Sequence, residues 1–218
     1  SLPTDTGPGA PAFAPAFAPV TFALGARALV TSRYHDPRPF RTYPDRARET
    51  GVAPDSARGV ALGLIDESVE RIADLLERSG DRLDALSRDV FAKPARGELR
   101  GSDFRVALTG IGREADFVAQ LRACLVSLER MLGFFTRELP DAGGAPGLRA
   151  LATTQAGDVA ALTQHADAMT QQTTLLLDAT LGLIDIEQAS IIKVFSVVAF
   201  AMLPPTLIAS VYGMNFAQ

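Results

Sequence analysis

Three aspartates on one side of a predicted helix are the first candidates for cation chemistry. Asp167, Asp178 and Asp185 are separated by 11 and 7 residues. At about 100° per residue these steps return to within about 20° of one direction, so the carboxylates form an acidic stripe. Between residues 147 and 190 the sequence holds five acids and a single base, Arg149. The alternative interpretation of the stripe is an ordinary solvated helix face.

The direction of the acidic stripe continues into an apolar part of the chain. Along it the residues change from acidic to small, apolar or hydroxyl-bearing, in the order Asp178, Asp185, Ala189, Ile192, Ser196, Ala199, Leu203, Thr206 and Ser210, as far as Gly213. A ring of such helices would have an acidic mouth for cations and a narrow, weakly polar throat. The sequence therefore indicates a pore-lining face.

The apolar run that carries this face is long enough to cross a bilayer. Val194–Tyr212 contains 19 consecutive residues without a charge. At about 1.5 Å per helical residue the run covers roughly 28 Å, close to the hydrocarbon thickness of a bilayer. The alternative, a fully buried helix of a soluble domain, would normally interrupt the run with a polar face. We therefore predict a transmembrane helix over 194–212.

Hydrophobic periodicity predicts three long helices. The first begins at about Pro54 and ends near Lys93-Pro94, the second covers 104–139, and "PDAGGAPG" at 140–147 is a clear break. The third extends from about Leu148 to Tyr212, with a kink or local unwinding at Pro204-Pro205. A helix of that length requires coiled-coil packing or oligomerisation. The apolar positions of the second helix are Leu108, Ile111, Ala115, Val118, Leu121, Leu125, Leu128, Leu132 and Phe135.

The amino-terminal part has a different character. Residues 1–19 are rich in proline and alanine, and we expect a linker because the prolines deny both helix and sheet ladders. In 20–34, two β-tolerant apolar runs flank Gly25, which predicts a hairpin. The predicted organisation is a linker (1–19), a β-hairpin remnant of an α/β domain (20–56), a helical hairpin (57–146), a stalk (147–193), a transmembrane helix (194–212) and a terminal loop (213–218).

Composition excludes several classes of function. The net charge of -4 leaves no broad basic surface for nucleic acid. A single cysteine and two distant histidines exclude an internal disulfide framework and a zinc site of standard spacing. No phosphate-binding loop or nucleophile constellation is present, so we expect a protein that is not an enzyme.

The segment "IEQASIIKVFSVVAFAMLPPTLIASVYGMNF" (186–216) resembles the first transmembrane helix and signature loop of the CorA family of magnesium transporters. The matching features are Gly-Met-Asn after Tyr212, the Pro-Thr pair at 205–206 and Lys193 before the apolar run. The hairpin and "LLERSGDRLDALSRDVF" resemble the edge of the family's cytoplasmic α/β domain and its first following helix. The resemblance covers residues 20–216.

The resemblance implies a mainly α membrane protein with a small β remnant, in a CorA-like funnel. It implies a homopentamer in the inner cell membrane, multi-pass in the full-length protein and with most of this chain in the cytoplasm. The ion filter would be Gly213, Met214 and Asn215, with Gly213 leaving the helix at positive φ. Asn215 amide oxygens would grip the hydrated ion. Within the pore, the resemblance assigns an acidic, metal-contacting ring to Asp178, constrictions to Ile192 and Leu203, a gate position to Phe195 and a pore threonine to Thr206.

The implied function is magnesium transport, with cobalt and nickel as further substrates and magnesium also as a regulatory ligand between cytoplasmic domains. Ala189 stands where the family commonly has a pore asparagine. The family's second membrane helix and most of its amino-terminal domain have no counterpart here, so we expect an incomplete chain. Two alternatives remain: the zinc-transporting branch, which usually has Ile at the position of Met214, and a non-conducting, membrane-anchored helical assembly or regulatory subunit.

Overall fold

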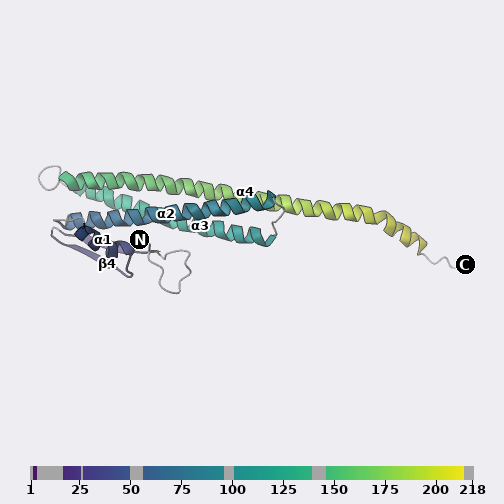
Figure 1. The fold of residues 1–218 in the computed structure, drawn as a ribbon, viewed down its shortest axis with the longest axis horizontal. Coiled ribbons are helices and arrows are strands. Elements are labelled where there is room, and N and C mark those ends of the chain that lie inside the picture. Colours follow the sequence, from purple (N-terminus) through teal and green to yellow (C-terminus); the bar gives the residue numbers. More distant parts are fainter. Residues whose placement is uncertain are drawn as a thin grey trace.

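Three long helices lie side by side, and the last of them extends far beyond the other two (Figure 1). The structure is a computed structural model. The long helices are α2 (Ala57–Ala95), α3 (Gly101–Glu138) and α4 (Pro146–Tyr212), close to the predicted limits. The structure describes residues 2–3, 17–25, 27–49, 56–95, 101–138 and 146–213.

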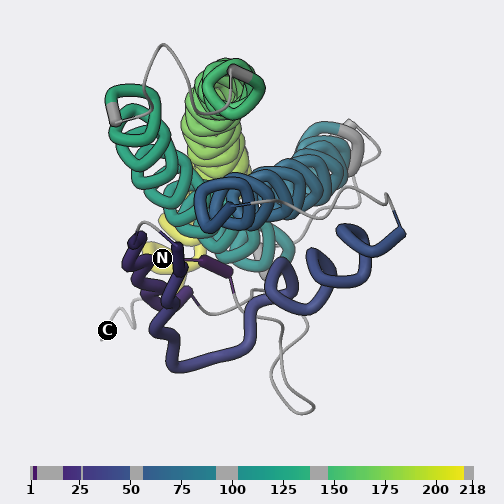
Figure 2. The backbone as a smooth tube through the Cα atoms, turned by 90° about the vertical axis from the view of Figure 1, so that its left-hand side faces the viewer, coloured from purple at the N-terminus to yellow at the C-terminus, as the bar shows by residue number. Residues whose placement is uncertain are grey.

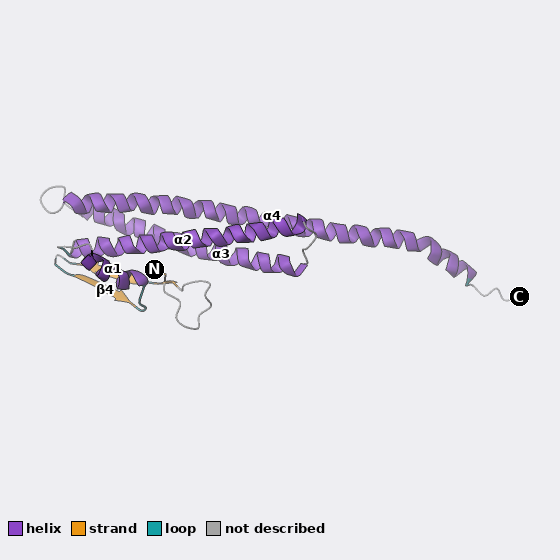
Figure 3. Cartoon of the chain, viewed as in Figure 1, coloured by secondary structure: helices purple, strands orange, loops and turns teal. Residues whose placement is uncertain are grey.

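The predicted hairpin is present as β3 (Val20–Leu24) and β4 (Leu29–Arg33), which pair antiparallel. At the turn, the Gly25 amide donates a hydrogen bond of 2.8 Å to the Ala28 carbonyl. On β3, half-buried residues alternate with exposed ones, as expected for a strand with one covered face. Figure 3 shows the two strands beside the first part of α2, toward the end of the bundle at which α3 ends and α4 begins.

The expectation that residues 1–19 form no sheet ladder is wrong for four of them. β1 (Leu2–Pro3) pairs antiparallel with β2 (Phe17–Ala18). A proline is tolerated in an edge strand because only its own amide donor is missing. Leu2 is buried, and the Phe17 ring lies 6.0 Å from the Phe117 ring on α3, so apolar side chains anchor this ladder to the helices.

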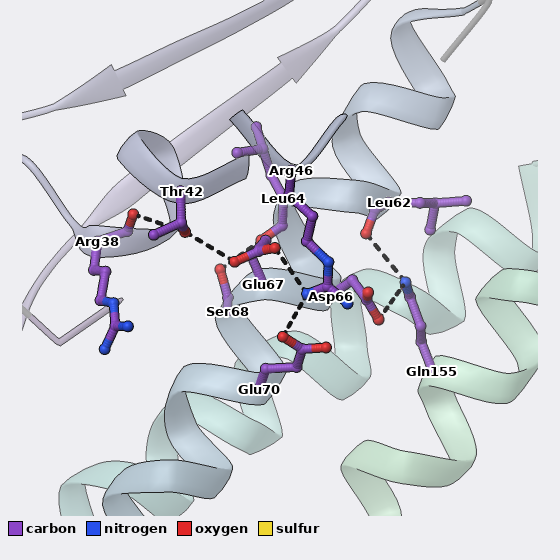
Figure 4. Close-up of polar contacts among 10 residues, drawn as sticks. All are labelled: Arg38, Thr42, Arg46, Leu62, Leu64, Asp66, Glu67, Ser68, Glu70 and Gln155. Carbon is purple, nitrogen blue, oxygen red and sulfur yellow. Dashed lines mark hydrogen bonds and ion pairs between the residues drawn. The ribbon is translucent and has the colours of Figure 1, made fainter. Parts of the chain in front are cut away.

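A short helix that periodicity did not predict, α1 (Arg38–Glu49), lies against the first half of α2. Its Tyr43 ring occupies the space beside Gly63, where an added Cβ would come within 2.1 Å of the ring. Glycine is therefore required at this contact. The Thr42 hydroxyl donates to Glu67 at 2.8 Å, and Arg46 contacts Glu67 at 2.9 Å and Glu70 at 2.5 Å (Figure 4).

The same end of α2 is tied to α4 by an amide side chain. Gln155 Nε2 donates hydrogen bonds to the Leu62 carbonyl at 3.1 Å and to Asp66 Oδ1 at 3.2 Å (Figure 4). Burial raises the pKa of the Asp66 carboxyl, and the bond from Gln155 opposes that rise. α1, α2 and α4 are thus joined near the beginning of the bundle.

The bundle is held by buried or half-buried side chains that recur at every third or fourth position of each helix, the spacing of a coiled-coil seam. On α4 the seam runs through Ala152, Gln155, Val159, Leu162, Ala166, Met169, Thr173, Leu176 and Thr180. Viewed end-on, the three helices enclose the core, with β3, β4 and α1 on one side (Figure 2). The large cluster consists of the buried apolar residues between Ala61 and Leu83 on α2, Phe117 and Phe135 on α3, and Ala152 and Met169 on α4.

Two apolar positions of the predicted stripe on α3, Leu108 and Ala115, are only half-buried. Next to Ala115, Glu114 is 1 % exposed and occupies the seam between Ile111 and Val118. Both residues fit a helical stripe, and the alanine is apolar. The carboxylate is accommodated because α2 supplies hydrogen-bond donors to it.

Candidate functional site

The acidic stripe divides into a paired part and an uncovered part. Asp167 forms an ion pair with Arg122 on α3, and both side chains are about half exposed at the surface of the bundle. Asp178 and Asp185 are exposed, and both lie on the membrane-side half of α4. The structure therefore pairs one carboxylate of the predicted stripe with a base and leaves the other two exposed.

Beyond the bundle, every residue of α4 from Gln188 to Tyr212 is exposed, as is Gly213. The apolar side chains that the sequence assigned to constrictions and a gate, Ile192, Phe195 and Leu203, are 64 %, 72 % and 66 % exposed. The small or hydroxyl-bearing members of the stripe, Ser196, Ala199, Thr206 and Ser210, are exposed as well. No contact within the described chain covers this face, so it is available to line a pore.

Among the described residues, α4 is the one helix long and apolar enough to cross a membrane. Its most apolar window has a mean hydropathy of 2.0, and none of that window is buried. A core helix of a soluble domain would have most of this window covered. The length, hydropathy and exposure of the segment agree with the predicted span.

Two hydroxyl groups on the stripe donate to their own helix. Ser196 Oγ donates to the Ile192 carbonyl at 2.8 Å, and Thr206 Oγ1 donates to the Met202 carbonyl at 2.7 Å. Each donor is thereby satisfied without water, and each oxygen keeps acceptor capacity toward an outside group.

Pro204 and Pro205 lie inside α4, and the helix continues through them. Neither proline has an amide hydrogen, so the carbonyls four residues earlier lose their helical donor. α4 bends toward its carboxyl-terminal end, in the part that carries the two prolines (Figure 1). The helix is kinked, and the predicted alternative of local unwinding is not observed.

Gly213 does not leave the helix at positive φ, and this expectation is wrong. Its amide continues the helical pattern with a 2.9 Å hydrogen bond to the Ala209 carbonyl. An added Cβ would lie 3.0 Å from that carbonyl oxygen, so a close approach of backbone atoms favours glycine here. Met214 and Asn215, the other two members of the predicted filter, lie outside the described residues.

The described part of the chain holds no group of three His, Cys, Asp or Glu side chains that could bind a metal ion. The acids that gather on α2 near α1 are engaged instead: Glu67 and Glu70 both contact Arg46, and these contacts raise the pKa of the guanidinium. On this face of α4, Asp178 and Asp185 lie two helical turns apart, so each is a single carboxylate at its height along the helix. A divalent cation on this face would need oxygen ligands from several copies of the chain or from its own water shell.

These features describe a helical membrane protein whose long helix extends out of a three-helix bundle and exposes an apolar span. The family description "CorA-like Mg2+ transporter protein" matches residues 4–218. The chain belongs to this family.

Curated relatives agree with that assignment. The magnesium transport protein CorA of Yersinia pseudotuberculosis is 34% identical over 199 residues, which is 90% of this chain and 60% of the relative. CorA of Escherichia coli K12 is 34% identical over 197 residues, with the same coverage of 90% and 60%. The chain thus spans about 60% of the length of these relatives.

Solved structures agree on the fold. The complete CorA magnesium transporter from Methanocaldococcus jannaschii has a TM-score of 0.67 at 17% identity, over 87% of this chain and 58% of that one. The full-length CmaX protein has a TM-score of 0.66 at 14% identity, over 99% of this chain and 63% of that one. The mainly α fold, with a long helix continuing into an apolar span, is therefore that of CorA transporters.

Proposed function

We propose that the full-length protein carries magnesium ions across the cell membrane through a pore lined by α4 from several copies of the chain. The observation that carries this proposal is the face of α4 that begins at the exposed Asp178 and Asp185 and continues through exposed Ser196, Thr206 and Ser210. An apolar anchor does not require carboxylates and hydroxyls in one line. The stoichiometry expected from the family resemblance is a homopentamer.

The chemistry of magnesium fits the groups on this face. Magnesium sheds its water reluctantly, so a pore can hold the hydrated ion through neutral oxygen acceptors. Asn215, at the outer end, would offer one amide oxygen per copy without a full charge that would hold the ion too tightly. At the cytoplasmic mouth, Asp178 and Asp185 would raise the local concentration of cations.

The remaining parts of the proposal follow from the family. Asp178 and Asn215 would contact the ion, and Gly213 and Met214 would complete the filter. Ile192 and Leu203 would form apolar constrictions, Phe195 would lie near the gate, and Ala199 would line the pore. Cobalt and nickel would be further substrates, and magnesium would also regulate the pore from the cytoplasm. The protein would be multi-pass, with the bundle on the cytoplasmic side.

The test is magnesium flux into liposomes that contain the purified full-length protein. We expect Asn215→Ala to abolish the flux, with the oligomer intact by size-exclusion chromatography. Gln218→Ala, three residues further along, is the matched control and should retain the flux. Normal flux through the Asn215→Ala variant would show that Asn215 does not form the ion filter.

The same liposomes distinguish the alternatives. Zinc flux that exceeds magnesium flux would favour the zinc-transporting branch. Well-folded oligomers of the unsubstituted protein that conduct neither ion would favour a non-conducting assembly.

A further inference from the structure

The core of the bundle is interrupted by a layer of polar residues. Each of the three helices has one polar residue at the same depth of its seam: Ser79 on α2, Glu114 on α3 and Thr173 on α4. These side chains are 0%, 1% and 4% exposed. Seam positions are otherwise mostly apolar, so a polar residue on all three helices marks a boundary within the core.

The hydrogen bonds of the layer join α2 to α3. Ser79 Oγ donates to Glu114 Oε2 at 2.6 Å, while Arg82 donates from Nε to Oε1 at 2.6 Å and from Nη2 to Oε2 at 3.1 Å. The Arg82 guanidinium also lies 5.5 Å from the centre of the Phe117 ring. The Thr173 hydroxyl donates to the Met169 carbonyl of its own helix at 2.7 Å. We define Ser79, Arg82, Glu114 and Thr173 as the polar layer.

The two sides of the polar layer are packed very differently. The large cluster lies on the side of the β-strands: it reaches Phe117 on α3 and Met169 on α4, and on α2 it extends one turn past Ser79, to Leu83. Among the described residues of the membrane side, a separate, small cluster consists of Val90, Ile111 and Leu176, with Leu86, Ala107 and Leu183 partly buried around it. Apolar burial contributes stability roughly in proportion to its area, so the membrane side is held less strongly.

Two hollows lie between helices on the membrane side. One, of about 100 Å³, is lined by residues of α2 and α3 that include Leu86, Val90 and Phe104. The other, of about 410 Å³, lies between α3 and α4 and is lined by residues that include Phe104, Leu108 and Ile184. Incomplete packing lowers the free energy needed to separate the helices locally.

We propose that the polar layer is a joint: the membrane-side ends of α2 and α3 separate from α4 while the large cluster stays packed. Water that enters between α4 and the other two helices can hydrogen-bond to the polar groups of the layer, so opening stops at the layer instead of spreading into the apolar core. Asp178 and Asp185 lie on the α4 segment that is released. The joint does not depend on ion conduction.

The test is hydrogen exchange of the full-length protein in nanodiscs, read by mass spectrometry. Opening at the joint predicts protection factors at least about tenfold lower on the membrane side than on the large-cluster side. The membrane-side segments are 84–95, 102–113 and 174–185, and the large-cluster segments are 61–78, 118–135 and 152–169.

Two variants test whether the polar layer causes the difference. The triple variant Ser79→Ala, Arg82→Met, Glu114→Leu joins the two clusters and should raise membrane-side protection toward that of the large cluster. Glu114→Gln keeps the size of the side chain but removes the charge, and should lower membrane-side protection severalfold with large-cluster protection unchanged.

Each contrary result is decisive. Equal protection on both sides in the unsubstituted protein would overturn the joint, and so would an equal change on both sides in Glu114→Gln. If the triple variant does not fold, Glu114→Gln alone decides. These readouts need no ion flux, so failure of the joint and failure of the proposed transport are distinguishable.

Discussion

α4 is one continuous helix, but side chains are buried in its first half and exposed in its second half. From Ala152 to Thr180 a buried or half-buried side chain recurs at every third or fourth position, against α2 and α3. From Gln188 to Tyr212 no side chain is buried, although most are apolar. The first half packs against other helices of this chain, and the second half has no such partner among the described residues. The difference shows that hydrophobicity alone does not locate the core of this protein.

The largest expected effect comes from placing a charge on the packed half. Ala166→Asp puts a carboxylate at a seam position that is fully buried, and we expect a loss of about 3–5 kcal/mol in the free energy of unfolding or failure to fold. Ala168→Asp, two residues away and exposed, should change stability by less than about 0.5 kcal/mol. Thermal unfolding of the full-length protein measures both. Equal losses would mean that the outer face is also covered in the assembly.

A smaller effect is expected where the two halves of α4 meet. Removing the exposed charges with Asp178→Asn and Asp185→Asn should slow magnesium uptake about tenfold at low ionic strength and less at high salt, because the effect is long-range attraction. Asp158→Asn, on the opposite side of the helix, is the control and should leave uptake unchanged. If the uptake rate responds equally to all three substitutions, or to none, the acidic stripe has no specific role in conduction.

The smallest effect concerns Asp167, which follows the stripe in sequence but belongs to the packed half. Its partner Arg122 is about half exposed, as Asp167 is, and exposed ion pairs contribute little. Asp167→Asn should lower the free energy of unfolding by about 0.2–1 kcal/mol, less in high salt, and leave magnesium uptake unchanged. Slower uptake at unchanged stability would contradict this and indicate that Asp167 lies on the ion pathway.

The sequence was sufficient for the three long helices because their apolar residues keep a helical spacing over many turns. It was also sufficient for the span, where 19 uncharged residues leave few alternatives. α1 was missed because Pro39 and Pro44 weaken its helical signal, and it forms through contacts of Tyr43 and Arg46 with α2. The β1–β2 ladder was missed because proline-rich sequence conceals apolar anchors such as Phe17.

The candidate site was harder to predict than the fold. Helical geometry placed Asp167, Asp178 and Asp185 on one side correctly, but only tertiary structure brings Arg122 to the first of them. Likewise, Glu114 and Ala115 both fit the stripe on α3, and the choice of the carboxylate depends on donors from Ser79 and Arg82, 35 and 32 residues away. Periodicity indicates which residues share a helix face, but it does not indicate which side chains of other helices contact that face.

The central claim is that one face of the exposed half of α4 lines a water-filled pathway. Single cysteines along α4, in a Cys124→Ser background of the full-length protein, can be tested for block of magnesium flux by a water-soluble thiol reagent. We expect block at Ser196, Ala199, Leu203, Thr206 and Ser210, and none at Val197, Ala201 and Ile208 on the opposite face. Block at positions on both faces of α4, or only on the opposite face, would contradict the account.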